Sequence, residues 1–294
     1  SLTTIFLSLL LLYKNSNSFE LTKKIRRNID NKKIFLLSDH YKFRKSYSPE
    51  NFKNTVKNKK KVLIVGNSIA EDFFKNFYFN KELFKKYDFE LISSKKRKRN
   101  SIYQVKCLEK LIRDNFTKCE GFEFTNNIIE QFQKSEIIIL STLWSEEDLK
   151  VLNDLIPLIH SRNKKVILTN QSIWMNIYTA KKLNPLDYYI YSNKIFPDKK
   201  KLKSIEKKVF ESLDQSKLDN IFLEKLDNIL LEKAKKFNIQ FLNMQKFQCN
   251  YNDKTCDLIT PDGYSIYFDR THNTEQGAKY LGNKIYELNW FTID

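Results

Sequence analysis

Glycine is scarce in this sequence, with five residues in 294, while lysine is abundant beside asparagine, isoleucine and phenylalanine. This joint bias is typical of an AT-rich coding background. It therefore weakens the net charge of +17 as evidence for a nucleic-acid or anionic-membrane partner. The chain also lacks a basic motif interleaved with aromatic residues, which argues against a nucleic-acid-binding protein. The apolar content of 41% is ordinary for a globular protein and argues against wholesale disorder.

The cysteines lack the C-x-x-C spacing of zinc and redox sites, so we expect neither a metal nor a cofactor. They fall into two local pairs, Cys107 with Cys119 and Cys249 with Cys256. Four buried thiols would fit this pattern, and so would two short-loop disulfides in an oxidising compartment. We favour disulfides, because local pairing is the simplest connectivity and Cys249 and Cys256 enclose a loop of turn-forming residues.

The apolar run at 5–13 (IFLSLLLLY) is too short to span a bilayer alone, which takes roughly 20 residues. No A-x-A cleavage site of a signal peptide follows it. It could be a signal-peptide core, a buried strand or helix, or the end of a truncated transmembrane helix. Because the sequence starts at Ser1 without a methionine, we favour a membrane-helix remnant over 1–13. The basic residues that follow would run against the positive-inside tendency if the next domain is exported.

Residues 14–60 are polar, basic and weakly periodic, which indicates a linker in front of a main domain at 61–294. Short apolar runs alternate with amphipathic segments in that domain, whereas 175–215 give no clear pattern. We predict strands at 62–65, 89–92, 136–141, 165–169 and 239–242, and helices at 70–79, 102–115, 125–134, 146–161, 218–237 and 274–288. This alternation predicts a three-layer α/β/α sandwich with a mostly parallel central sheet.

Gly66-Asn67-Ser68 lies between the first predicted strand and the helix that follows it. Ligands gather at the carboxyl ends of the strands in such sheets. A serine on a sharp turn there presents its hydroxyl, and its amide points from the helix N-terminus toward a developing anion. Gly66 permits the tight turn, and Asn67 can hold it with its side chain. A helix-capping serine without catalytic function would give the same local pattern.

A serine nucleophile needs a base, usually histidine, whose ring is in turn oriented by a carboxylate. The chain has three histidines. His160 lies in a predicted helix, where a surface or packing role is expected, and His40 lies in the polar linker. His272 lies in a loop three residues after Asp269 and just before the last predicted helix, for which Thr274 is the expected N-cap. The pair Asp269 and His272 could therefore supply both the base and its orienting acid.

Taken together, these segments resemble the SGNH hydrolase superfamily. They are most similar to the C-terminal SGNH domain of membrane-bound acyltransferases that O-acylate bacterial surface polysaccharides. The run VLIVGNSIAEDF at 62–73 is similar to the nucleophile block, normally G-D-S-H. Segment 119–144, which ends in EIIILSTLW, is similar to that group's cysteine, helix and strand ending in tryptophan. Cys249 and Cys256, followed by DGYSIYFDRTHNTEQGAKYLG at 262–282, resemble its C-terminal block.

The resemblance implies an SGNH, flavodoxin-like fold with Ser68 as nucleophile, His272 as general base and Asp269 as its orienting acid. Gly66, Asn67 and Ser68 would form the oxyanion-stabilising turn.

The sequence departs from the family pattern at several places. Asn67 stands where aspartate is usual and Asn273 where leucine is usual. The superfamily's further oxyanion donors, a glycine and an asparagine, have no clear match. Trp144 and Thr142, which follow the strand at 136–141, could contact the substrate, and a plain core role is the alternative for Trp144.

The resemblance further implies a preceding membrane domain that delivers the acyl donor. The SGNH domain would then face the periplasm or extracytoplasmic side of a bacterial inner membrane. We expect serine-dependent O-acylation, such as acetylation, of a cell-surface polysaccharide or lipopolysaccharide, with the carbohydrate as acceptor and no nucleic acid as partner. A free-standing carbohydrate esterase or deacetylase and an inactive glycan-binding domain are the alternatives.

Overall fold

A computed structural model describes residues 58–93, 102–114, 118–119, 122–123, 126–170, 172–173, 175, 183–213 and 221–293. These residues fall into two compact units, which we describe separately. The sheet unit comprises the described residues of 58–173, 221–248 and 278–293, and the loop unit comprises 175, 183–213 and 249–277. The predicted membrane-helix remnant at 1–13 and the predicted linker up to residue 57 lie outside the described residues. None of the helices in the described part is both long enough and apolar enough to cross a membrane.

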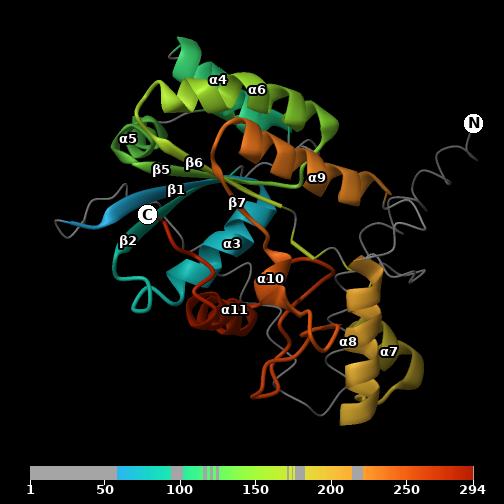
Figure 1. Cartoon of the computed structure of the whole chain (residues 1–294). Helices are drawn as coiled ribbons and strands as arrows, with labels where there is room; N and C mark the ends of the chain where they lie inside the picture. Colours follow the sequence, from blue (N-terminus) through green and yellow to red (C-terminus); the bar gives the residue numbers. More distant parts are fainter. Residues whose placement is uncertain are drawn as a thin grey trace, which may run out of the picture. The chain divides into compact units, whose positions relative to one another are not determined.

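The sheet unit is built on five strands in the order β2-β1-β5-β6-β7, all paired in parallel (Figure 1). Their bounds are β1 Lys60–Gly66, β2 Tyr87–Ser93, β5 Ile137–Ser141, β6 Lys165–Thr169 and β7 Gln240–Leu242. The central strand β5 is buried along its whole length, as expected for a parallel sheet covered on both faces. The predicted α/β sandwich with a mostly parallel sheet is therefore confirmed.

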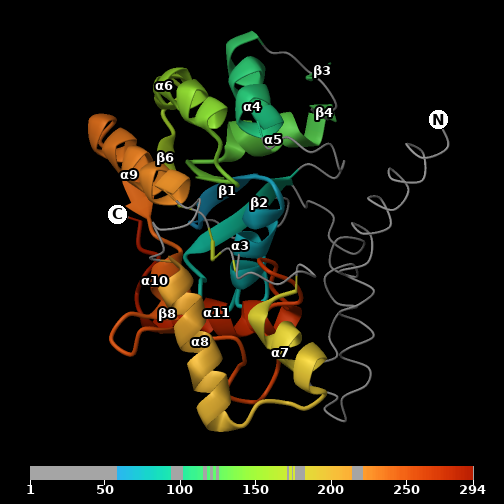
Figure 2. The same cartoon turned by 90° about the vertical axis from the view of Figure 1, so that its right-hand side faces the viewer.

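Helices cover both faces of this sheet (Figures 1 and 2). One face carries α4 (Ile102–Asp114), α6 (Glu146–His160) and α9 (Ile221–Lys236), with α5 (Asn126–Lys134) at its edge. The short α10 (Gln245–Gln248) follows β7 and lies toward the opposite face, where Phe247 packs against Trp290 (Figure 1). The other face carries α3 (Ser68–Tyr78) and the sheet-unit part of α11 (Glu275–Glu287). Two-residue strands, β3 (Lys118–Cys119) and β4 (Phe122–Glu123), form a small antiparallel ladder between α4 and α5.

Alternate residues of each strand fill two different cores, because successive side chains point to opposite faces of a sheet. On the α4–α6–α9 face, Leu63 of β1 and Ile138 of β5 belong to one buried cluster with residues of the three helices. On the α3 face the core is aromatic, with the Phe77 ring stacked on Phe89 of β2 at 4.2 Å between centroids. Phe73, one turn earlier in α3, packs edge-on against Phe77. Both faces of β1 are therefore fixed immediately before Ser68.

The loop unit contains α7 (Pro185–Asn193), α8 (Lys199–Leu213) and a small hairpin of β8 (Cys249–Asn250) and β9 (Thr255–Cys256). The predicted disulfide between Cys249 and Cys256 joins the two strands of this hairpin. Both helices lie in the segment 175–215 that gave no clear pattern. In α8 only Ile205 and Val209 are buried, and the remaining apolar residues are half-buried among lysines.

Candidate active site

The strands β1 and β5 are neighbours at the point where the connections of the sheet diverge. The chain passes from β1 to β2 on one side, while β5, β6 and β7 follow on the other. Ligands of open parallel sheets bind at the carboxyl ends of the strands next to such a point. Gly66 ends β1 there and pairs in register with Ser141 of β5. A β-carbon on Gly66 would lie 1.7 Å from the Ser141 carbonyl oxygen, so no larger residue fits.

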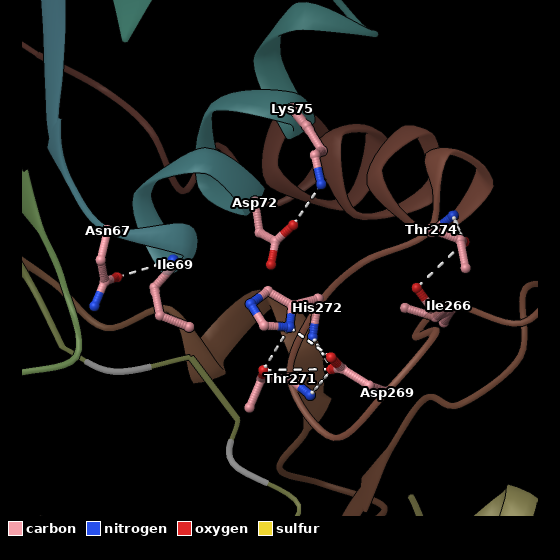
Figure 3. A network of polar contacts seen from close by, with 10 residues as sticks. Asn67, Ile69, Asp72, Lys75, Ile266, Asp269, Thr271, His272 and Thr274 are labelled. Carbon is pink, nitrogen blue, oxygen red and sulfur yellow. Dashed lines mark hydrogen bonds and ion pairs between the residues drawn. The ribbon is translucent and has the colours of Figure 1, made fainter. Parts of the chain in front are cut away.

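Ser68 is the first residue of α3 and is half-buried. Asn67 provides the N-cap, and its side-chain oxygen accepts a hydrogen bond of 3.0 Å from the Ile69 amide (Figure 3). The capping role that could have explained Ser68 without catalysis therefore belongs to Asn67. An amide oxygen caps a helix about as well as a carboxylate, so asparagine serves where aspartate is usual.

Trp144 is 2% exposed, and its indole N–H donates to the Thr169 carbonyl at 2.7 Å. It belongs to the buried cluster on the α4–α6–α9 face. The structure thus favours the core role that the sequence left open for Trp144, in place of a contact with substrate. Thr142 directly follows β5 and is completely buried, so its side chain also offers no surface to a substrate.

Asp269 and His272 lie in direct contact in the loop unit, as Figure 3 shows. The Asp269 Oδ2 atom is 2.7 Å from His272 Nδ1. The other oxygen, Oδ1, accepts hydrogen bonds of 2.8 Å from the backbone amides of Thr271 and His272. One carboxylate therefore closes the turn and orients the ring at the same time. The predicted pairing of these two residues is present in the structure.

The surroundings of Asp269 and His272 determine where the protons lie on the two side chains. Burial would raise the pKa of the Asp269 carboxyl, but the charge of His272 and the hydrogen bonds from His272 and Thr271 outweigh it and lower the pKa to about 2. The carboxylate is thus ionised at neutral pH, and it favours the tautomer of His272 with the proton on Nδ1. The Nε2 atom of that tautomer carries the lone pair of a general base. The Phe268 ring stacks on the imidazole with 5.4 Å between centroids and keeps it in place.

Backbone contacts on both sides hold this loop. Phe268 N donates to the His272 carbonyl at 3.0 Å, which closes the loop across Asp269. The predicted capping role of Thr274 is confirmed, because its Oγ1 accepts a hydrogen bond of 2.9 Å from the Gly277 amide. The same hydroxyl donates to the Ser265 carbonyl at 2.6 Å. His272 is therefore fixed two residues before the N-cap of α11.

A contact from α7 also reaches the loop, and the sequence gave no sign of it. The N-cap of α7 is Asn184, whose side chain accepts the Asp187 amide at 2.8 Å. Its Nδ2 donates to the Asp187 carboxylate at 2.6 Å and to the Asp269 carbonyl at 3.4 Å. Met175 N donates to the Arg270 carbonyl at 3.1 Å. The segment before α8 is thus attached to the backbone of the Asp269–His272 loop.

A buried ion pair follows Ser68 along α3. Lys75 Nζ lies 2.7 Å from Asp72 Oδ1, and the two residues are 1% and 3% exposed. Asp72 comes four residues after Ser68 and so lies on the same side of the helix. Buried ion pairs contribute little net stability. We therefore interpret this pair as a structural constraint on α3 next to Ser68. The signal in the sequence was an acid and a base three residues apart, in a helix that also contains Glu71 and several phenylalanines.

The structure describes only some of the remaining predicted residues. Cys107 is disulfide-bonded, and the side chain of its predicted partner Cys119 lies outside the described residues, so that pairing stays a prediction. His160 is the exposed last residue of α6, and His40 lies outside the described part of the chain.

Comparisons with known proteins place these features in a family. A family model described as "SGNH domain (fused to AT3 domains)" matches residues 37–287. No protein in the curated collection matches the sequence.

Solved structures similar to the chain share little sequence with it. The periplasmic domain of a lipopolysaccharide acetyltransferase from Salmonella ser. Paratyphi A has 14% identity and a TM-score of 0.48, covering 80% of this chain and 85% of that one. A putative acylhydrolase from Bacteroides fragilis has 16% identity and a TM-score of 0.40, covering 81% and 91%. A GDSL-like lipase from Bacteroides thetaiotaomicron has 15% identity and a TM-score of 0.37, covering 85% and 96%.

Because the family model spans most of the sequence, the protein belongs to the family of SGNH domains that are fused to AT3 domains.

Proposed function

We propose that this chain transfers an acyl group through Ser68, with His272 as general base and Asp269 as the acid that orients it. The observation that carries the proposal is the contact of 2.7 Å between Asp269 Oδ2 and His272 Nδ1. A carboxylate with a pKa of about 2 on Nδ1 leaves Nε2 as the basic atom of the ring. Ser68 supports the proposal from the other unit, because it begins α3 but Asn67 takes the capping role. The proposal requires the Ser68 hydroxyl to approach Nε2 of His272.

The expected chemistry follows from these groups. His272 Nε2 removes the Ser68 hydroxyl proton as Oγ attacks the carbonyl carbon of the acyl donor. The oxyanion that forms lies at the N-terminus of α3, where the Ser68 amide and the helix dipole stabilise it. The protonated imidazole then gives its proton to the leaving group, and an acyl-serine ester remains. An acceptor hydroxyl, deprotonated by the same Nε2, takes the acyl group and restores the serine.

We infer that the acceptor is a cell-surface carbohydrate and that the acyl donor comes from a membrane domain. The family is defined by its fusion to AT3 domains, which supports a membrane acyltransferase partner. The Salmonella protein to which the chain is similar is a lipopolysaccharide acetyltransferase periplasmic domain. The disulfide between Cys249 and Cys256 is typical of an oxidising compartment, which supports a periplasmic location.

The test is a transfer assay with a radiolabelled acetyl ester as donor and surface polysaccharide as acceptor. Wild type is expected to label the polysaccharide, and Ser68→Ala is expected to lose transfer completely. Label that appears only as free acetate would assign the protein to the esterases. Transfer at the wild-type rate by Ser68→Ala would contradict the role of Ser68. Neither transfer nor hydrolysis by a folded wild type would favour the inactive glycan-binding alternative.

A further inference from the structure

The outer side of α7 carries the exposed Tyr188 and the half-buried Tyr189 and Tyr191, close to lysines that follow the helix in the sequence. Leu186 and Ile190 face inward and are buried, whereas Tyr188 is 40% exposed. Ile195, in the turn after α7, is 60% exposed. Large apolar groups gathered at one place on a surface commonly mark an interaction site. We call this region, with residues 188–201, the tyrosine–lysine surface.

Lysines of this surface lie over its tyrosine rings. The Lys194 ammonium is 4.3 Å from the centre of the Tyr191 ring, and the Lys201 ammonium is 5.4 Å from that of Tyr189. The second contact joins α8 to α7, which lie side by side in Figures 1 and 2. Each cation is therefore held next to an aromatic face. A ligand that has both an anionic group and an apolar face could contact a lysine and a tyrosine of this surface at the same time.

The charge of the surface is strongly positive. Lysines 194, 199, 200 and 201 of this surface are exposed, against the single exposed acid Asp198. The Asp198 carboxylate already accepts the Lys201 amide at 2.7 Å, so it is engaged within α8. The first turn of α8 contains no acidic residue, and its lysines add to the positive end of the helix dipole. Complementarity therefore requires an anionic partner.

The surface is attached to the loop that carries His272. Asn184 caps α7 and donates to the carbonyl of Asp269. A ligand held on α7 would thus be held by the element that contacts the backbone beside the proposed general base. A carbohydrate chain fits this geometry, because a sugar ring can stack its C–H face on the exposed Tyr188 ring while its carboxylate pairs with a nearby lysine.

We propose that the tyrosine–lysine surface binds the acceptor as an acidic polysaccharide, one whose repeat carries uronate carboxylates. This inference rests on the proposed function and names the substrate class of that site. The binding it requires does not depend on acyl transfer, so the two can fail separately.

The test is calorimetric titration of the full chain with polygalacturonate oligosaccharides, with neutral dextran of the same length as control. Wild type is expected to bind polygalacturonate, more weakly as salt screens the lysines, and not to bind dextran. The double variant Lys194→Gln/Lys201→Gln should bind at least about tenfold more weakly, and Tyr188→Ala should also weaken binding.

Lysine is frequent all over this chain, so a matched control is needed. Lys150→Gln/Lys235→Gln removes the same charge from exposed positions of α6 and α9 in the sheet unit. It should bind polygalacturonate as wild type does. Equal weakening in both double variants would show attraction by net charge alone and overturn the inference. Circular dichroism melting curves confirm that each variant is folded.

Two further outcomes separate the alternatives. Stronger binding to phosphatidylglycerol vesicles than to polygalacturonate, lost in Lys194→Gln/Lys201→Gln, would assign the surface to a membrane and overturn the glycan inference. Ser68→Ala should bind polygalacturonate like wild type. If it does while the transfer assay shows no role for Ser68, the inference stands and the proposed function fails. If transfer depends on Ser68 but no polygalacturonate binds, the inference fails and the function stands.

Discussion

The carboxylate of Asp269 makes two separate contributions to His272. One oxygen lies 2.7 Å from Nδ1 of the ring, and the other accepts the backbone amide of the same residue at 2.8 Å. The side chain that orients the imidazole thus also fixes the loop that carries it. A change at Asp269 will therefore affect catalysis and stability by different mechanisms, which can be measured separately.

Asp269→Asn removes the charge and leaves a group of the same size. An asparagine amide can donate to Nδ1 and then favours the wrong tautomer of His272, with the proton on Nε2. We expect turnover of an acetyl ester to fall about a thousandfold to ten-thousandfold, as for the equivalent change in other serine triads. Steady-state kinetics of wild type and variant measure this. A loss below tenfold would show that Asp269 does not orient a catalytic base.

The lowered pKa of Asp269 also predicts how stability depends on pH. The folded-state pKa of about 2 lies below the value near 3.9 of an unfolded aspartate. The contribution to the free energy of unfolding is therefore fully present above about pH 4 and is lost as the pH falls toward 2. Because 40% of the Asp269 side chain is exposed, solvent screening makes the effect modest.

Denaturant unfolding between pH 2 and 6 tests this. The fall in stability below pH 4 should be shallower in Asp269→Asn than in wild type, since the variant has no proton to take up at this position. Identical slopes would mean that the carboxylate is not coupled to folding.

The capping role of Asn67 predicts that two substitutions at this position affect stability differently. Asn67→Ala removes the acceptor for the Ile69 amide and should lower the free energy of unfolding by about 1 kcal/mol. Asn67→Asp keeps an oxygen in the same place and restores the usual family residue, so it should be as stable as wild type or slightly more so. Thermal melts compare the three proteins. If alanine cost nothing, Asn67 would not be the cap of α3.

The disulfide between Cys249 and Cys256 closes the hairpin that leads into the segment 258–274. Cys249→Ser/Cys256→Ser should lower the free energy of unfolding by about 2 kcal/mol, mainly because the unfolded chain becomes less constrained. Denaturant curves under non-reducing conditions measure the difference. Reduction of wild type should give a shift at least as large, because it also breaks the disulfide of Cys107. A much smaller shift in the double variant would mean that the hairpin is held by its packing against α8.

Much of the fold could be predicted because the strands are short apolar runs between charged or turn-forming residues. The strand at 165–169 was predicted with the bounds that β6 has, and the helix at 102–115 with nearly those of α4. Helices α7 and α8 could not be found in this way. The apolar residues of α8 do recur at helical spacing, but lysine occupies six of its fifteen positions and only Ile205 and Val209 are buried.

The candidate site was predictable where the chemistry is local. The pair Asp269 and His272 is three residues apart, so a single loop brings them together. The sequence also indicated that Asn67 could hold the turn and left a core role open for Trp144, but it did not identify their partners, the Ile69 amide and the Thr169 carbonyl. The hydrogen bond from Asn184 to Asp269 joins residues 85 positions apart, and no local sequence pattern indicates it.

The most direct measurement of the central claim is labelling of the full chain by a fluorophosphonate, with the modified residue located by mass spectrometry. The proposal predicts a single adduct on Ser68, formed at least about a hundredfold more slowly in His272→Ala because the base is gone. A folded wild-type protein in which Ser68 remains unmodified, or a His272→Ala variant that labels at the wild-type rate, would contradict it.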